Sequence, residues 1–93
     1  KTLNIFVFTV GFNASLLHAA AKANRSSMID LLCRMGLSPD IRGGYDDATP
    51  LHIAAWNNCL DAAKELVRCG ASIELRSGRH HNNTPAGWAV VAG

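Results

Sequence analysis

Short blocks of apolar residues at helical spacing alternate along this chain with clusters of turn-forming residues. The clearest two blocks predict one helix from about Pro50 to Asn57 and a second from about Leu60 to Cys69. Thr49 suits the N-cap of the first helix, Asn58 a left-handed turn between the two, and Gly70 the left-handed cap that ends the second. Apolar residues fall on one face of the second helix: Ala62, Ala63, Leu66 and Val67. The pattern therefore predicts a pair of short helices joined by a tight turn.

The same arrangement stands upstream. Ser15 can cap a helix over about residues 16–23, and Gly36 closes a second helix that is rich in apolar residues. Ser27 and Asp30 resemble a capping box at the start of that second helix. The chain thus repeats one helix–turn–helix unit.

One short motif marks the start of each unit and recurs at a nearly constant step. It reads Ser15-Leu-Leu-His-Ala-Ala-Ala21, Thr49-Pro-Leu-His-Ile-Ala-Ala55 and Thr84-Pro-Ala-Gly-Trp-Ala-Val90. The starting positions 15, 49 and 84 are 34 and 35 residues apart, and the closing glycines at 36 and 70 are also 34 apart. This pattern resembles the T-P-L-H-x-A signature of ankyrin repeats, and the resemblance covers about residues 13–93.

The resemblance implies an all-α fold, an ankyrin-repeat solenoid of helix–turn–helix units joined by β-hairpin-like finger loops. Residues 13–47 would form a first repeat, residues 48–82 a second, and residues 83–93 the first helix of a truncated third. About three stacked repeats are needed for stability, so we expect a fragment of a longer array or ends that a partner covers. Open solenoid ends would also allow end-to-end self-association.

Residues 1–12 form an N-terminal flank with more than one interpretation. Smaller β-branched residues alternate with phenylalanines from Ile5 to Thr9, which predicts a strand or irregular cap against the first repeat. The apolar run after Lys1 also has the outline of a short signal-peptide core, although polar residues interrupt it. A native cap, a linker and a processed leader all stay open for this segment.

Composition narrows the class of protein without indicating a reaction. Apolar residues make up 48% of the 93 residues and charged residues 17%, which is typical of a globular chain. The net charge of +2 is too small to favour nucleic acid or an anionic membrane as a partner. No apolar run reaches the roughly 18 residues of a transmembrane helix. Three cysteines without framework spacing predict reduced thiols in a cytoplasmic or nuclear protein.

The resemblance also indicates where a partner would bind, because ankyrin repeats usually grip proteins with their finger tips and the concave face of their first helices. Ten residues follow from this: Lys22, Trp56 and Asn57 on the helices, Arg42, Tyr45 and Asp46 on the first finger, and Arg76, Arg79, His80 and His81 on the second. Trp56 is the expected anchor, because truncating an interface aromatic typically costs about 2 kcal/mol or more. Trp56 could instead pack over a neighbouring finger, and Tyr45 could cover its own hairpin.

Several other residues have structural interpretations. His18 and His52 match the motif histidine that, in the resembled repeats, hydrogen-bonds the backbone and orders the turn. Trp88 replaces a core-facing apolar residue of the motif, so we expect it to be buried. Gly87 takes the position of the motif histidine, so the third unit lacks that imidazole.

The sequence predicts neither catalysis nor a bound cofactor or metal. No cysteine has a paired base with an orienting acid. His80 and His81 are adjacent, and neighbouring side chains in a strand or turn tend to point in opposite directions, with no further ligand at zinc spacing. Gly43-Gly44 lacks the flanking elements of a phosphate-binding loop. The chain is therefore not expected to be an enzyme.

These observations predict a non-catalytic module that binds another protein through its concave helix face and finger loops. The second finger is basic through Arg76 and Arg79, so a partner segment with an acidic residue near an apolar one would suit it. The alternative is an internal structural or regulatory slice of a longer ankyrin-repeat protein, associated with an enzyme or a channel, with no binding activity of its own.

Overall fold

The fold is built from short helices. A computed structural model describes residues 15–93, so the flank predicted over residues 1–12 lies outside the described residues. The described part contains five α-helices: α1 Leu16–Lys22, α2 Ser26–Arg34, α3 Pro50–Trp56, α4 Leu60–Arg68 and α5 Pro85–Ala92. None of the five is long and apolar enough to cross a membrane.

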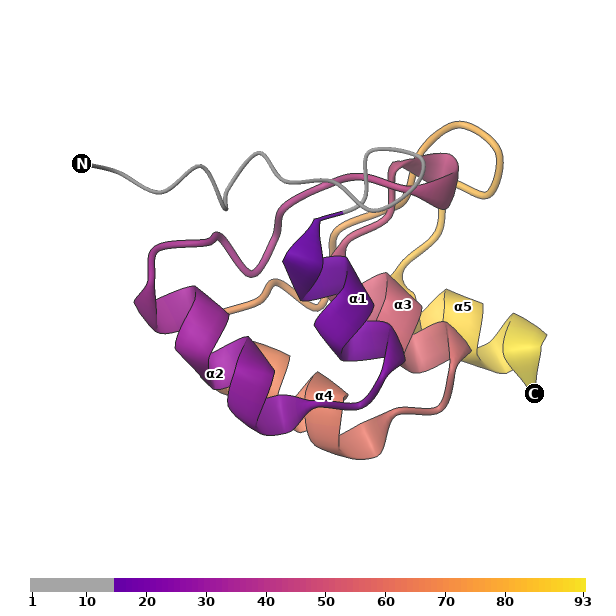
Figure 1. Cartoon of the computed structure of the whole chain (residues 1–93). Helices are drawn as coiled ribbons and strands as arrows, with labels where there is room; N and C mark the ends of the chain where they lie inside the picture. The colour runs from indigo at the N-terminus through magenta and orange to yellow at the C-terminus, as the bar shows by residue number, and fades with distance from the viewer. Residues whose placement is uncertain (1–14) are drawn as a thin grey trace.

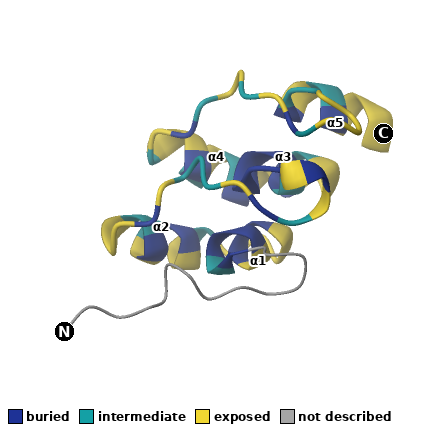
Figure 2. Ribbon diagram, turned by 90° about the horizontal axis from the view of Figure 1, so that it is seen from above, coloured by how far each residue is buried: buried dark blue, intermediate teal, exposed yellow. Residues whose placement is uncertain are grey.

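The helices stack as pairs in two rows. α1, α3 and α5 lie side by side in one row, and α2 and α4 form the other (Figure 1). Seen from above, the pair α1 and α2, the pair α3 and α4, and then α5 follow one another as successive levels (Figure 2). This arrangement is the predicted all-α solenoid of helix–turn–helix units.

Local sequence sets where the helices of the first row begin. The hydroxyls of Ser15, Thr49 and Thr84 each accept a hydrogen bond from the backbone amide three residues later, at 3.2–3.4 Å. Pro50 and Pro85 follow at the first helical position, where a missing N–H costs nothing. The predicted N-caps are confirmed.

Residues with left-handed backbone angles end the helices, as the sequence predicts. Asn24 and Asn58 have φ of 58° and 55° in the turn between paired helices, and Gly36 and Gly70 have φ of 106° and 101° after the second helix of each pair. Other residue types rarely adopt these angles. The turns therefore fix the spacing between the two rows.

The capping box predicted at Ser27 and Asp30 is wrong. α2 begins at Ser26, so Ser27 lies inside its first turn, and Arg25 occupies the N-cap without a side-chain hydrogen bond. The carboxylate of Asp30 pairs instead with Arg68 on α4. The helix therefore begins one residue before the position that Ser27 would need to occupy as its N-cap.

The core lies between the helices. Its buried side chains come from both rows, and alanines among them let the helix backbones approach closely: Leu17, Ala20, Ala21, Ile29, Leu32, Leu51, Ala54, Ala62 and Leu66. Figure 2 shows the buried positions where successive levels face one another. Burying apolar surface in this way supplies roughly 25 cal/mol per Å² of stabilisation.

The connector over residues 35–49, which we call the first finger, joins α2 to α3. Gly43 and Ala48 form a single antiparallel bridge, with the Gly43 amide 3.0 Å from the Ala48 carbonyl. A 3₁₀ turn, η2 (Tyr45–Asp47), closes the tip, and Asp46 adopts a left-handed φ of 54°. Within residues 15–93 the hairpin-like finger is thus one bridged pair and a turn, without a continuous strand.

Candidate partner-binding groove

A hollow of about 480 Å³, which we call the groove, opens where the first row of helices meets the fingers. The second finger is the connector over residues 69–84, between α4 and α5. The groove walls combine aromatic, aliphatic and polar side chains: Lys22, Tyr45, Ile53, Trp56, Asn57, His81, Asn83, Trp88 and Val91. Its volume falls in the range of sites that enclose a ligand.

Two tryptophans dominate the groove. Trp88 on α5 is buried, with 6% of its surface exposed, and it meets the ring of Trp56 edge to face at a centroid distance of 5.9 Å. Its ring also contacts His52 at 4.9 Å and His81 at 5.8 Å. Trp56, at the end of α3, keeps 48% of its surface exposed. The predicted burial of Trp88 is confirmed, and Trp56 rests on it while staying open to solvent.

A buried hydrogen-bond chain holds Trp88 in place. The indole Nε1 of Trp88 donates to the hydroxyl oxygen of Ser77 at 3.2 Å, and the amide of Asn83 donates to the same oxygen at 3.2 Å. The buried Trp88 is thereby tied to the second finger.

Asp46 lies at the centre of the contact between the two fingers. Its carboxylate accepts hydrogen bonds from the amides of His80 at 2.8 Å and His81 at 2.9 Å, and its backbone carbonyl accepts one from Gly78 at 2.6 Å. Burial alone would raise the pKa of Asp46, but these bonds to the carboxylate outweigh it and hold the pKa below its ordinary value. Asp46 is therefore an ionised anchor for the second finger.

Side chains join the finger tips as well. The hydroxyl of Tyr45 lies 3.1 Å from Nε2 of His81, and the Tyr45 ring stacks on His80 at a centroid distance of 6.2 Å. The guanidinium of Arg42 donates to the backbone carbonyl of Arg76 at 2.7 Å. These contacts make one continuous wall of the two fingers.

His18 and His52 tie each first helix to the finger that follows it. Nε2 of His18 lies 2.7 Å from the carbonyl of Ala48, and Nε2 of His52 lies 2.7 Å from the carbonyl of Asn83. A carbonyl only accepts, so Nε2 carries the proton in both rings and Nδ1 accepts from the amide of the N-cap residue. The backbone-bonding role that the resemblance implied for these histidines is confirmed.

Both imidazoles are held in their neutral form. Burial lowers the pKa of His18 and of His52, and the hydrogen bonds to the carbonyls only partly offset it. Protonating Nδ1 would set its N–H against the amide N–H of the N-cap. Acid would therefore disrupt the cap contact at Nδ1 of each ring, while Nε2 keeps its proton for the finger carbonyl.

The groove gathers half of the predicted partner-binding residues, namely Lys22, Tyr45, Trp56, Asn57 and His81. The other five lie outside it: Arg42, Asp46, Arg76, Arg79 and His80. Arg42 and Arg76 each donate to backbone carbonyls of the second finger. Arg79 and His80 are exposed on that finger.

The interpretation of Asp46 as a partner-binding residue needs correction. Only 8% of its surface is exposed, and both carboxylate oxygens accept hydrogen bonds from the second finger. Asp46 has a left-handed backbone at the tip of the first finger and is buried there. It shapes the groove wall and offers little surface to a partner.

Four groove residues are not among the ten predicted partner-binding residues: Ile53, Asn83, Trp88 and Val91. The repeat register holds the signal for three of them. Ile53 and Trp88 occupy the x position of T-P-L-H-x-A, and Val91 occupies the position of Trp56 one unit later. Equivalent positions on stacked helices share one face, so the groove follows two columns of the repeat.

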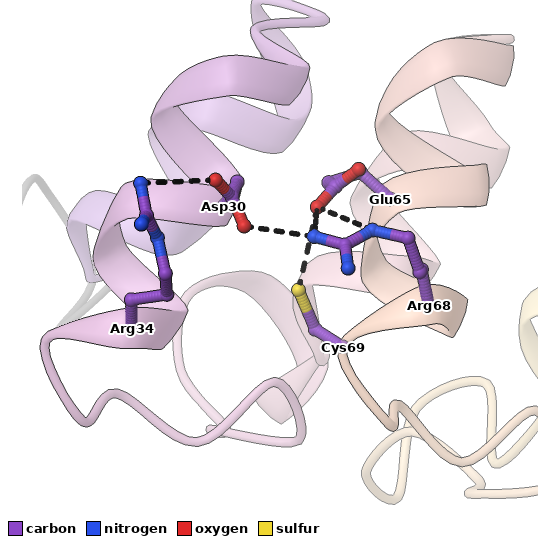
Figure 3. A network of polar contacts seen from close by, with 5 residues as sticks. All are labelled: Asp30, Arg34, Glu65, Arg68 and Cys69. Carbon is purple, nitrogen blue, oxygen red and sulfur yellow. Dashed lines mark hydrogen bonds and ion pairs between the residues drawn. The ribbon is translucent and has the colours of Figure 1, made fainter.

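A second polar cluster joins α2 to α4 in the other row of helices (Figure 3). Arg68 on α4 pairs with Asp30 on α2 at 2.7 Å and with Glu65 one turn earlier on its own helix. Arg34 pairs with Asp30 at 3.3 Å. The hydrogen bond from Arg68 lowers the pKa of Glu65, and the same bond raises the pKa of Arg68. The Arg34 and Arg68 side chains are 73% and 62% exposed, so the cluster lies at the surface.

The described lining of the groove contains neither a metal-binding cluster nor a cysteine. Among residues 15–93, no three His, Cys, Asp or Glu side chains gather closely enough to hold a metal ion. Cys33 lies outside the groove, and burial is the main cause that raises its pKa to about 12. It is therefore a thiol and not a thiolate at neutral pH.

The stacked helix pairs and the groove beside their fingers define a helical repeat protein. The family profile described as "Ankyrin repeats (3 copies)" matches residues 2–77 of the chain. The chain belongs to the ankyrin-repeat family, and the resemblance carried by its recurring motif is confirmed. Ankyrin repeats are generally non-catalytic modules of protein interaction.

The chain is also similar to segments of much longer proteins. It is 38% identical over 64 residues to potassium channel KOR2 of Oryza sativa subsp. japonica, and the match covers 69% of this chain and 8% of the relative. It is 33% identical over 66 residues to palmitoyltransferase AKR1 of Kluyveromyces lactis, and that match covers 71% of this chain and 9% of the relative. It is 34% identical over 74 residues to protein fem-1 homolog A of Bos taurus, covering 80% and 10%. The chain thus spans about a tenth or less of the length of these curated relatives.

Proposed function

We propose that the groove binds an extended segment of another protein, without a chemical reaction, and that Trp56 is its anchor. The observation that carries this is the setting of Trp56: it is 48% exposed, yet its ring already rests on the buried Trp88 inside a hollow. A large aromatic side chain left open in a partly enclosed site is typical of interface hot spots. The general role of ankyrin repeats supports the same function.

The groove is pre-formed, which favours binding. Hydrogen bonds that Asp46 accepts from the second finger hold that finger against the first, and the bond that Ser77 accepts from Trp88 holds it against α5. A site that is already ordered loses less conformational entropy when a partner binds. Tyr45 and His81 would form one wall for the partner, while Lys22 and Asn57 would border the helix ends. Arg79 and His80, exposed on the second finger, would extend the contact.

Selection from a displayed library of random peptides tests the proposal on the full chain. Trp56→Ala is the informative variant, and Leu60→Ala is its matched control, because Leu60 is 63% exposed but lies outside the groove. We expect the parent and the control to enrich the same peptides. Trp56→Ala should bind those peptides about 30-fold more weakly, which corresponds to about 2 kcal/mol.

Two results would contradict the proposed function. Peptides that bind the parent and Trp56→Ala equally well would show that the groove is not the site. No enrichment at all would leave the groove without a ligand of this class. Sedimentation of the free chain at several concentrations accompanies the selection, because the exposed Val90 and Val91 on α5 would support end-to-end self-association.

A second candidate is an internal structural or regulatory segment, and the coverage of the relatives favours it. The chain matches 8–10% of proteins whose names describe a channel, a palmitoyltransferase and a fem-1 homolog. In that case the ends of the stack, and not the groove, would contact another part of the same longer protein. A chain of this kind would enrich no peptide through Trp56, so the same selection separates the two candidates.

A further inference from the structure

The charge of the groove is one-sided. Lys22 and His81 line it, and no aspartate or glutamate does. Residues 1–14 contain no acidic residue in their sequence either. Lys22 is exposed and forms no ion pair with the described residues. The ionised Asp46 lies beside His81, whereas Lys22 has no carboxylate in the described groove lining to offset its charge.

The acidic residues of the chain are engaged or placed elsewhere. Asp30 and Glu65 are paired with arginines on the outer row of helices, which is the row formed by α2 and α4. Asp40 accepts a hydrogen bond from the amide of Ser72 at 2.9 Å, and Asp46 is buried between the fingers. The remaining three lie outside the groove: Asp47, Asp61 and Glu74. The described lining of the groove therefore carries the positive charge of Lys22 without an aspartate or glutamate to offset it.

Lys22 and His81 border an apolar centre of the groove. Lys22 stands at the end of α1, and His81 stands on the second finger. Between these two elements the groove is lined by α3 and α5, which supply Ile53, Trp56 and Trp88. A bulky side chain can therefore occupy the middle while charged neighbours reach the borders.

We propose, building on the function above, that the partner segment carries a bulky apolar residue flanked by aspartate or glutamate. The apolar side chain packs against Trp56 and Trp88, and the flanking carboxylates pair with Lys22 at the helix ends and hydrogen-bond to the imidazole of His81 at the finger. Aromatic walls also attract cations. A cationic ligand is disfavoured here because Lys22 would repel it and no carboxylate lines the groove beside Lys22 to offset that charge.

The chain offers its own reporter for this site. Its only two tryptophans, Trp56 and Trp88, both line the groove, so a change in intrinsic fluorescence indicates occupation of the groove itself. The strongest binder from the peptide selection is made in matched forms whose residues beside the apolar position are glutamate, glutamine or lysine. Each form is titrated into the full chain and into Lys22→Glu. Lys64→Glu is the control, because Lys64 is an exposed lysine on α4, outside the groove.

We expect the enriched peptides to carry acidic residues beside an apolar one. The glutamate form should bind on the order of fivefold more tightly than the glutamine form, and the lysine form more weakly than either. Lys22→Glu should remove or reverse that order, while Lys64→Glu should keep it. Added salt should narrow the differences.

Several outcomes would overturn the inference, and they differ from those that overturn the proposed function. Peptides that depend on Trp56 but bind equally with all three flanks would retain the function and reject the acidic partner. A preference for lysine would do the same, as would a glutamate preference that Lys22→Glu leaves unchanged. Fluorescence that shifts with chain concentration in the absence of peptide would assign the groove to a second copy. No enrichment of any peptide would reject both proposals.

Discussion

The groove side and the outer side of this solenoid both use polar side chains to join consecutive repeats, but in different surroundings. On the groove side, His18 and His52 reach the next finger through hydrogen bonds at 2.7 Å, and both rings are buried. On the outer side, Asp30 and Arg68 join α2 to α4 through an ion pair whose arginine is 62% exposed. The histidine hydrogen bonds are shielded from water, whereas water competes for the groups of the exposed ion pair.

This difference decides which side sets the geometry of the groove. A buried donor or acceptor that loses its partner costs about 1–3 kcal/mol, because it can no longer bond to water. Exposed ion pairs contribute little, since water and salt screen them and long side chains must be ordered. We therefore expect changes on the groove side to disturb stability and finger position more than changes to the outer cluster.

We expect His52→Ala to cause the largest loss in the free energy of unfolding. This change leaves the Asn83 carbonyl without its donor, removes the acceptor for the Thr49 amide and withdraws the edge contact with Trp88. We expect a loss of about 3 kcal/mol in the free energy of unfolding, measured by urea denaturation. His52→Gln, whose amide can still donate, should lose less.

His80→Ala is the matched control for that substitution, because His80 is an exposed histidine on the second finger. We expect it to change the free energy of unfolding by less than about 0.5 kcal/mol. Equal losses for the two variants would mean that the buried contact of His52 does not hold helix and finger together.

Asp46→Asn should have the next largest effect, and a local one. An asparagine amide keeps one acceptor oxygen but sets an N–H₂ group against one of the two amide donors, those of His80 and His81. We expect a loss of about 1–2 kcal/mol and faster hydrogen exchange at those two amides. Asp47→Asn is the control, since Asp47 is exposed. Unchanged exchange in Asp46→Asn would show that the carboxylate does not hold the second finger.

Mild acid should weaken the groove side next. Burial lowers the pKa of His18 and His52 in the folded chain, so below about pH 6.5 the unfolded chain binds protons that the folded chain resists. The contribution of these two histidines to the free energy of unfolding is fully present above about pH 6.5. It is lost as the pH falls through their lowered pKa values, by at most about 1.4 kcal/mol per histidine per pH unit. The lowered pKa of Asp46 acts only at more acidic pH, below its ordinary value of 3.8.

Urea midpoints between about pH 7 and pH 5.5 measure this effect, with His52→Gln as the comparison. The variant should lose less stability on acidification than the parent chain, because it retains only His18 as a buried motif histidine. A parent chain whose midpoint does not fall in this range would contradict the assignment of neutral, buried imidazoles.

The sequence predicts the helices and their caps well because those features depend on neighbouring residues. Thr49 caps α3 and Asn58 makes the turn after it, as their side-chain chemistry dictates. The role of Asp46 could not be predicted in this way. Its partners lie 34 and 35 residues away on the second finger, and only the folded chain brings them together.

Gly78 shows the same limit at the level of the backbone. A Cβ added there would lie 2.9 Å from the carbonyl oxygen of Asp46, so the close approach of the fingers requires glycine. In the sequence Gly78 is one turn residue among several. Trp88 was predictable as a buried residue from its motif position, but its part in the groove depends on Trp56 and His81 meeting its ring.

The smallest effect is expected for Arg68→Ala on the outer side. The change breaks the pairs with Asp30 and Glu65, yet all three groups stay in reach of water, and Asp30 keeps Arg34. We expect a small fall in the urea midpoint that shrinks further as salt is added, with peptide binding in the groove unchanged. Lys64→Ala, on the same helix but outside the cluster, controls for the loss of one positive charge. A loss as large as that of His52→Ala would invert the comparison, because the exposed cluster would then hold the repeats together.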